Sequence, residues 1–221
     1  MKYSTQLLVA MADAIAPRYC SGCRGVLMPV EKHLCTTCSD RLRWRPNGYS
    51  PGLPLFDRVR VGLSFDVGPV QSLVHAGKYN GQKELFRYLG QCMAHSMDPL
   101  PLDTLLIPVP LTALKMQRRG YNQSHWIAMG LSDIWECPVL ERALYRTSQK
   151  KSQTSLSKTE RRRNTEGVFA LWPLGIPPLS ESRIALVDDT LTTGATLQSC
   201  ALALRLWNPA RLEALALAWA E

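Results

Sequence analysis

The sequence predicts an α/β fold, in which a mainly parallel sheet is flanked by helices, with a small N-terminal four-cysteine zinc ribbon. Three observations predict it. Strand-like and helix-like segments alternate after about residue 55, four cysteines cluster before that point, and a stretch rich in proline and glycine separates the two parts. With 221 residues, 46% of them hydrophobic, the chain can form one ordinary domain with a small appendage.

The expected elements of the larger part follow in alternating order. Strands are expected at residues 59–65, 105–109, 140–146, 168–171, 184–187 and 212–219. Helices are expected at residues 69–75, 82–97, 122–135 and 196–207. Strands that alternate with helices at this spacing are typical of βαβ units, which favour a parallel sheet.

The chain divides into four expected segments. They are an N-terminal amphipathic helix (1–17), a zinc ribbon (18–45), a linker (46–56) and a large domain (57–221). The first segment faintly resembles a signal peptide, but its apolar run is short and Asp13 interrupts it. One helical face instead gathers Tyr3, Leu7, Leu8, Met11, Ala12 and Ile15. We therefore expect an amphipathic helix that docks on the body of the protein.

Composition also bears on location. No apolar run approaches the roughly 20 residues needed to cross a bilayer, so no transmembrane segment is predicted and we expect a soluble protein. The cysteine count is seven, an odd number, and four of the seven are clustered. A secreted disulfide framework is usually even and more evenly spread, so we expect a reducing, cytoplasmic setting.

The clustered cysteines form two CxxC pairs, Cys20 with Cys23 and Cys35 with Cys38, separated by eleven residues. Each CxxC turn places two thiolates about a tetrahedral edge apart, and two turns supply the four sulfurs that zinc prefers. A redox CxxC pair and an iron–sulfur cluster are the alternatives. Within the zinc interpretation we expect a closed, structural site, because four sulfurs leave no open position for chemistry.

The segment Ile184–Thr196 carries the most informative pattern. An apolar strand is followed by two adjacent carboxylates, Asp188 and Asp189, and by a Thr/Gly loop that opens a helix. Backbone N–H groups at a helix N-terminus, together with threonine hydroxyls, form an anion site at the carboxyl end of a strand. Carboxylates beside it accept hydrogen bonds from a sugar diol or help to hold a divalent ion. An ordinary capped helix start would not require this combination, and the chain contains neither a P-loop nor a Rossmann motif.

This segment resembles the phosphoribosyl pyrophosphate (PRPP) motif of type I phosphoribosyltransferases. The resemblance implies a phosphoribosyltransferase-like large domain, in which the candidate catalytic residues Asp188 and Asp189 contact the ribose hydroxyls. It also implies that the following loop holds the 5′-phosphate, through the candidate substrate-binding residues Thr190, Thr192, Thr193, Gly194, Ala195 and Thr196. Mg²⁺ is expected to accompany PRPP.

Further segments resemble the ComF/GntX family. They are Pro108-Val-Pro110, Arg118-Arg-Gly-Tyr-Asn-Gln123, and Gln153 with Arg161-Arg-Arg-Asn164 and Gly167-Val-Phe169. A four-cysteine ribbon ahead of a phosphoribosyltransferase domain is the usual layout of that family, and the resemblance covers essentially residues 18–219. Members are associated with competence, DNA uptake and the use of DNA as a nutrient. The DNA-uptake machinery and single-stranded DNA are therefore candidate partners.

Basic residues are candidates for phosphate contact. By resemblance, Lys78 falls in the region of a pyrophosphate loop, with a plain surface lysine as the alternative, while Arg118 and Arg119 precede the start of a helix. Residues 141–166 hold eight Lys/Arg against three Glu. The resemblance implies a flexible loop that closes over pyrophosphate, and the alternative is a merely solvated basic loop.

Two functions stay open at this point. One is a Mg²⁺-dependent phosphoribosyltransferase or related PRPP-using enzyme, whose acceptor the sequence does not identify. The other is a non-catalytic factor that binds single-stranded DNA through the phosphate loop and a basic surface. The net charge of +8 and the pI of about 9.3 favour polyanionic partners without choosing between them.

Overall fold

A four-stranded parallel sheet forms the centre of the protein. The computed structural model describes residues 13, 15–45, 52–79, 81–147, 168–172 and 181–220. The strands lie in the order β1-β6-β5-β2, with bounds β1 (Arg58–Ser64), β2 (Thr104–Pro108), β5 (Arg183–Leu191) and β6 (Arg211–Trp219). A separate antiparallel pair consists of β3 (Leu144–Arg146) and β4 (Phe169–Leu171).

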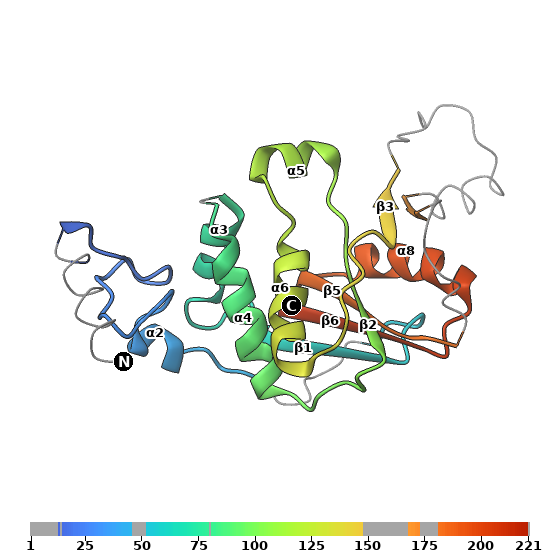
Figure 1. The fold of residues 1–221 in the computed structure, drawn as a ribbon, viewed down its shortest axis with the longest axis horizontal. Coiled ribbons are helices and arrows are strands. Elements are labelled where there is room, and N and C mark those ends of the chain that lie inside the picture. The colour runs from blue at the N-terminus through green and yellow to red at the C-terminus, as the bar shows by residue number, and fades with distance from the viewer. Residues whose placement is uncertain are drawn as a thin grey trace.

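Helices cover both faces of the sheet (Figure 1). They are α3 (Val70–Tyr79), α4 (Lys83–Ser96), α5 (Ala113–Arg119), α6 (Gln123–Trp135) and α8 (Ala195–Leu204). Alternate residues of β5 divide the core: Ala185 and Val187 pack with the cluster that includes α3, α4 and α6, and Ile184 and Leu186 pack with the α8 cluster. The predicted fold class, a mainly parallel sheet flanked by helices, is confirmed.

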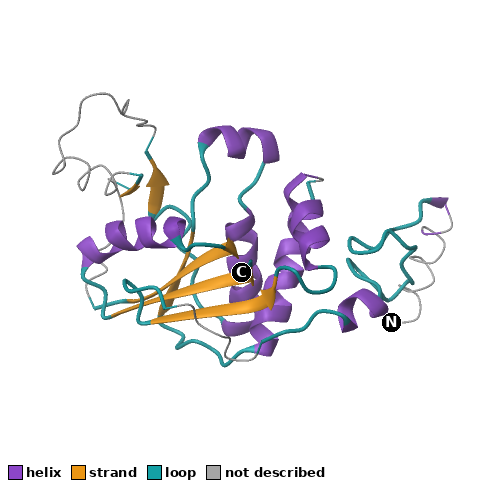
Figure 2. Cartoon of the chain, turned by 180° about the vertical axis from the view of Figure 1, so that it is seen from behind, coloured by secondary structure: helices purple, strands orange, loops and turns teal. Residues whose placement is uncertain are grey.

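The four-cysteine module lies at one end of the molecule, beside α3 and α4 (Figure 2). A bridge between Tyr19 and Val26 closes its first turn, and the short helix α2 (Thr36–Asp40) carries the last cysteine. Buried residues of the module and of α3 belong to one hydrophobic cluster, which joins Leu34 and Cys38 to Val70 and Leu73. The module is therefore packed onto the larger domain.

Helices α4 and α6 approach each other through two glycines. A β-carbon at position 90 would lie 2.4 Å from the carbonyl oxygen of Ile127, and one at position 130 would lie 2.1 Å from that of Arg87. Neither distance leaves room for a side chain, so backbone meets backbone at this crossing. The close contact brings α6 against α4 and the sheet, and it places the N-terminus of α6 near the carboxyl ends of β2 and β5.

The structure differs from the expected elements in several places, and two of these differences bear on the site. Strand β5 continues through Asp188 and Asp189 to Leu191, because β6 stays paired with it as far as Trp219. Helix α5 was not predicted; Thr112 caps its first turn by accepting a hydrogen bond from Lys115 N, and Gly120 ends it in a left-handed conformation.

Several predictions fall outside the described residues. They are most of the N-terminal helix (1–12 and 14), the first part of the linker (46–51) and most of the basic segment (148–166). Ile15, a described member of the expected docking face, is 89% exposed. No helix in the described part of the chain has the length and apolar character needed to cross a membrane.

We expect the substitution Gly130→Ala to destabilise the fold by about 2–3 kcal/mol, because the added methyl group collides with the Arg87 carbonyl. This loss opposes the better helix propensity of alanine, which is worth about 1 kcal/mol. Urea unfolding measures the change. Gly52→Ala is the matched control, since a β-carbon there meets nothing within 4 Å. A Gly130→Ala protein as stable as the control would contradict the close crossing.

Candidate functional site

The four clustered cysteines converge, as their spacing predicted. The sulfur atoms of Cys20, Cys23, Cys35 and Cys38 all lie within 4.8 Å of one another. The Cys23 and Cys35 sulfurs are 3.7 Å apart, which matches the ~3.8 Å edge of a tetrahedron with zinc–sulfur bonds of about 2.3 Å. The Gly22 and Cys35 backbone N–H groups donate to the sulfur of Cys20 at 3.4 and 3.3 Å. The cluster therefore fits a closed zinc site with four thiolate ligands.

A cavity of about 270 Å³ opens at the carboxyl end of β5. Its walls come from the end of α3, the segment after β2, α5, the first turn of α6, β3, the end of β5, the loop after it and the first turn of α8. The predicted site residues that line it are Lys78, Arg119, Asp188, Asp189, Thr190, Thr192 and Thr196. Segments far apart in the sequence thus meet around the acidic pair.

The two carboxylates are held by specific partners. Ser124 Oγ donates to Asp188 Oδ1 at 3.1 Å, and the Asp189 backbone N–H donates to the same oxygen at 2.9 Å. Lys78 Nζ lies 2.8 Å from Asp189 Oδ2. Both side chains of this ion pair are largely buried, with 21% and 13% of their surfaces exposed. Each aspartate therefore has one oxygen engaged within the protein.

Burial raises the pKa of Asp188 to about 7, and the neighbouring charge of Asp189 adds to the rise. The hydrogen bonds from Asp189 N and Ser124, and the charge of Lys78, lower the same pKa and only partly offset the rise. Ionisation of a carboxyl in this buried environment costs free energy unless a bound group donates hydrogen bonds to it.

The segment after the acidic pair forms the start of α8. Gly194 caps the helix in a left-handed conformation with φ of 76°. This conformation favours glycine, and a β-carbon there would also lie 2.5 Å from Leu53 Cδ2. The N-terminus of α8 then faces the cavity with Thr192 and Thr196 in its wall, an arrangement suited to an anion.

Two polar atoms in the cavity wall have no hydrogen-bond partner in the described residues. They are Gln123 Nε2 and Thr190 Oγ1, and both are buried. Buried polar groups are bonded in the large majority of cases, and leaving one unpaired costs about 1–3 kcal/mol. A ligand, or a water held with it, is the natural partner for these atoms.

Some predicted site residues do not line the cavity. Arg118 is exposed on α5 and Thr193 is exposed in the loop, where its Oγ1 accepts from Ala195 N at 3.4 Å. Gly194 is the cap and Ala195 the first residue of α8, and neither lines the cavity. Of the charged residues of the basic segment, only Glu141, Arg142 and Arg146 lie in the described part of the chain, and Arg146 lines the cavity.

Sequence reasoning missed Ser124 and Lys115 as site residues. Both line the cavity, and Ser124 orients Asp188. The sequence did contain a signal for Ser124, namely the helix-capping residue Asn122 two positions before it. In the structure, Asn122 caps α6 by accepting a hydrogen bond from Ser124 N, and its side-chain amide donates to the carbonyl of Val109, which directly follows β2. That cap fixes the first turn of α6 at the sheet edge where the acidic pair lies.

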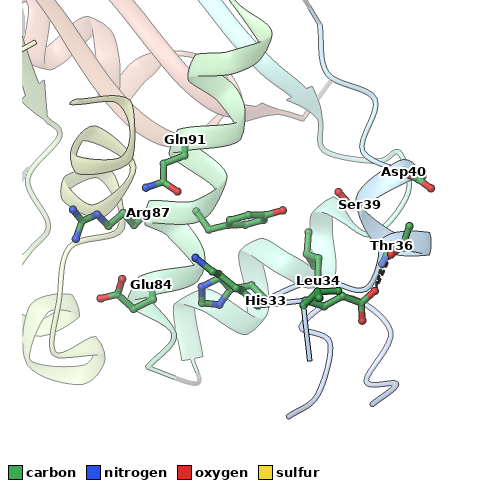
Figure 3. A pocket seen from close by; sticks show the side chains of 12 residues that line it. His33, Leu34, Thr36, Ser39, Asp40, Glu84, Arg87 and Gln91 are labelled. Atoms are coloured by element: carbon green, nitrogen blue, oxygen red, sulfur yellow. Dashed lines mark hydrogen bonds between the residues drawn. The ribbon is translucent and has the colours of Figure 1, made fainter. Parts of the chain in front are cut away.

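A larger cavity, of about 660 Å³, lies between the cysteine module and α4 (Figure 3). His33 from the module reaches toward α4, with its ring 5.5 Å from that of Tyr88. Four of its polar side chains are bonded within the protein: Arg87 and Gln91 bind Asp133, and Glu31 binds Thr36 and the Met28 N–H. The smaller cavity, which holds the acidic pair and the unpaired polar atoms, is the better candidate site.

We expect the purified protein to contain about one zinc ion per chain, and Cys38→Ser to lose it, because Cys38 is a buried member of the ligand set. Elemental analysis measures the metal, and chelation should lower thermal stability, since metal binding in such modules contributes to folding. Cys92→Ser, on α4 and outside the cluster, is the control. Iron in place of zinc, or full zinc content in Cys38→Ser, would contradict the assignment.

The raised pKa of Asp188 predicts a pH-dependent effect of Asp188→Asn on stability. The unfolded chain releases this proton near pH 4 and the folded chain near pH 7, so the wild type loses stability as pH rises across that window, by roughly 2–4 kcal/mol. Asparagine carries no such cost. The stability of the variant relative to the wild type should therefore rise from about pH 4 to 7 and then level off. A difference in unfolding free energy that is flat with pH would contradict the shift.

The chain is similar to several bacterial proteins over most of its length. No protein-family model matches the chain. It is 28% identical over 208 residues to "Competence protein F" of Haemophilus influenzae, covering 84% of this chain and 90% of that protein. It is 28% identical to "DNA utilization protein YhgH" of Salmonella typhi, covering 84% and 89%. It is 26% identical to "Competence protein ComFC" of Bacillus subtilis, covering 83% and 76%.

Two solved structures are similar to part of the chain. One is the glutamine PRPP amidotransferase of B. subtilis, with a TM-score of 0.46 and 14% identity over 65% of this chain and 30% of that enzyme. The other is described as the allosteric regulatory enzyme of purine biosynthesis, with a TM-score of 0.42 and 16% identity over 59% and 25%. The competence and DNA-utilisation relatives, matched over most of the chain, support the ComF family that the sequence motifs indicated.

Proposed function

We propose that this protein binds PRPP, or another ribose 5-phosphate group, in the cavity at the end of β5, and that it acts in DNA uptake or utilisation. The observation that carries the binding proposal is the acidic pair beside the N-terminus of α8. The carboxylates of Asp188 and Asp189 suit a diol, while the helix start with Thr192 and Thr196 suits a phosphate. A sugar phosphate presents both groups at once.

The charge of the cavity supports an anionic ligand. Lys78, Lys115, Arg119 and Arg146 line it, against the two aspartates. Among the described residues, only the first of these four cations pairs with a carboxylate. Arg119 lies over the ring of Tyr79 and Arg146 over that of Phe169. The remaining positive charge is therefore available to phosphate oxygens.

We propose that Mg²⁺ binds together with the ligand. Apart from the cysteine cluster, no group of three or more His, Cys, Asp or Glu in the described ranges is placed to hold a metal. Mg²⁺ is commonly bound by one or two carboxylates together with substrate phosphates, which fits the acidic pair with PRPP present. When bound, it would supply positive charge to the pyrophosphate.

A PRPP-binding site of this kind would serve phosphoribosyl transfer. In it the bond from ribose C1 to pyrophosphate breaks, the pyrophosphate leaves with the electron pair, and a new bond forms from C1 to an acceptor. Residues of this cavity would bind and orient PRPP and stabilise the leaving pyrophosphate electrostatically. No described residue identifies the acceptor, so the proposal is based on the binding of PRPP.

Single-stranded DNA binding is the second candidate function. The net charge of +8 and the relatives named for competence and DNA utilisation favour it. Trp44 lies between Arg43 and Arg45, where an aromatic ring could stack on a base, but its side chain is partly buried against the core. Affinity for DNA through several phosphates falls steeply with salt, whereas PRPP held in a cavity should respond less. Titrations at two salt concentrations separate the candidates.

We expect Asp188→Asn combined with Asp189→Asn to weaken PRPP binding by at least about 100-fold, because two charge-assisted hydrogen bonds to the diol are lost. Isothermal titration with Mg²⁺ measures this, and unfolding experiments establish that the variant is folded. Thr193→Ala, whose hydroxyl is exposed outside the cavity wall, is the comparison variant with a small expected effect. Unchanged PRPP affinity in the double variant would refute the site.

A further inference from the structure

The segment that leads from the cysteine module to β1 lies against both ends of α8. At the start of the helix, a β-carbon added at Gly194 would lie 2.5 Å from Leu53 Cδ2, 3.1 Å from its Cδ1 and 3.4 Å from its Cγ. At the other end, Arg205 donates to the Leu55 carbonyl from Nη2 at 2.9 Å and from Nε at 3.3 Å. The sequence predicts a plain linker here (46–56), but its described part makes specific contacts with the helix that begins at the candidate phosphate site.

The same segment is anchored to the start of β6. Asp57 N donates to the Leu212 carbonyl at 2.8 Å, and Leu212 N donates to Asp57 Oδ2 at 2.7 Å. Phe56 N donates to the Leu53 carbonyl at 3.0 Å, which closes a turn and connects the leucine to this anchor. Residues 53–57 are therefore held by the sheet as well as by α8, and the backbone that carries Leu53 has a defined position.

Leu53 supports the phosphate loop, residues 192–196, from outside the cavity. Its side chain is 9% exposed and belongs to the same hydrophobic cluster as Leu191 and Leu197, which directly precede and follow that loop. Leu53 does not itself line the cavity. A ligand in the cavity therefore meets the loop, and the loop meets the leucine behind it.

The conformation of Gly194 depends on its surroundings. Its φ of 76° lies in the left-handed region, and glycine enters other regions about as readily. Leu53 supplies the three heavy atoms nearest to the position of a β-carbon at residue 194, so the leucine limits the movement of the glycine on that side. Backbone N–H groups that converge on a phosphate bind it more tightly when they are fixed before binding.

We propose that Leu53 is a positioning residue of the candidate site: it holds Gly194 in the left-handed conformation and so keeps the N-terminus of α8 directed at the 5′-phosphate of the ligand. The inference rests on the proposed function and deepens it, because it extends the phosphate site to a segment that lies before β1 in the chain. A leucine that only filled the core would contribute to stability, whereas a positioning leucine also contributes to affinity.

The test compares wild type, Leu53→Ala and Leu100→Ala by calorimetric titration with PRPP and with ribose 5-phosphate in the presence of Mg²⁺. Leu100 is the matched control, because it is 4% exposed but precedes β2, at the ends of the strands opposite the cavity. Both truncations should lower the free energy of unfolding. We expect only Leu53→Ala to weaken both ligands, by about tenfold each, because both carry the 5′-phosphate. Leu53→Met, which restores the side-chain volume, should recover most of the affinity.

A double-mutant cycle tests the contact itself. Leu53→Ala removes the atoms with which a β-carbon at position 194 collides, so Gly194→Ala should destabilise the Leu53→Ala protein less than the wild type. The left-handed strain of alanine is present in both backgrounds and cancels in the comparison. Urea unfolding of the wild type, the two single variants and the double variant measures the coupling. Additive losses of stability would refute the contact on which the positioning role depends.

The affinities separate this inference from the proposed function. If Leu53→Ala binds both ligands as tightly as the wild type, or if Leu100→Ala weakens them equally, the positioning role is refuted while the proposed function stands. Failure of Leu53→Met to restore affinity would refute the role in the same way. If the wild type binds neither PRPP nor ribose 5-phosphate, the proposed function fails and the inference with it.

Discussion

The pairing of β5 with β6 beyond the acidic pair is the constraint on which the candidate site depends. Asp188 pairs with Ala216, Thr190 with Ala218, and Leu191 with Trp219. The carboxylates are therefore part of a hydrogen-bonded strand with its conformation set by the sheet. Gly194 can then turn the chain into α8 at a fixed point, and the acidic pair and the helix N-terminus keep a constant separation. Such rigid placement suits a ligand whose hydroxyls and phosphate are themselves at a fixed distance.

Helix α3 connects the cysteine module to this site. A β-carbon at Gly22, within the first CxxC turn, would lie 2.9 Å from Cys38 Sγ and 3.3 Å from Pro69 Cβ, so the turn packs directly against the residue before α3. Ser21 Oγ also donates to Gln82 Oε1 at 2.8 Å, at the start of α4. The module thus contacts the chain just before and just after α3, and Lys78 lies between these contacts. A metal that folds the module also restrains the segment that presents Lys78.

Much of the fold was predictable because it depends on local pattern. The six strands and the four longest helices follow from apolar periodicity, and the cysteine cluster follows from spacing alone. The rest depends on tertiary contacts. Strand β5 is longer than its apolar run because β6 pairs with its polar end, and α5 has no buried residue to produce a periodic signal. Lys78 was predicted near phosphate, yet its bond to Asp189 joins residues more than a hundred positions apart, and no single sequence records that contact.

The acidic pair also sets a physical limit on how this protein can interact with DNA. Two carboxylates repel a bare phosphate backbone, and a cavity of about 270 Å³ is suited to a single sugar phosphate. Deoxyribose lacks the 2′-hydroxyl, so a DNA terminus would leave one of the two aspartates without its hydrogen bond. Backbone-dependent DNA binding needs an extended series of cations, which the cavity does not provide. A role in DNA utilisation is therefore best reconciled with this site if the cavity binds a small ribose phosphate while DNA contacts a different surface of the chain.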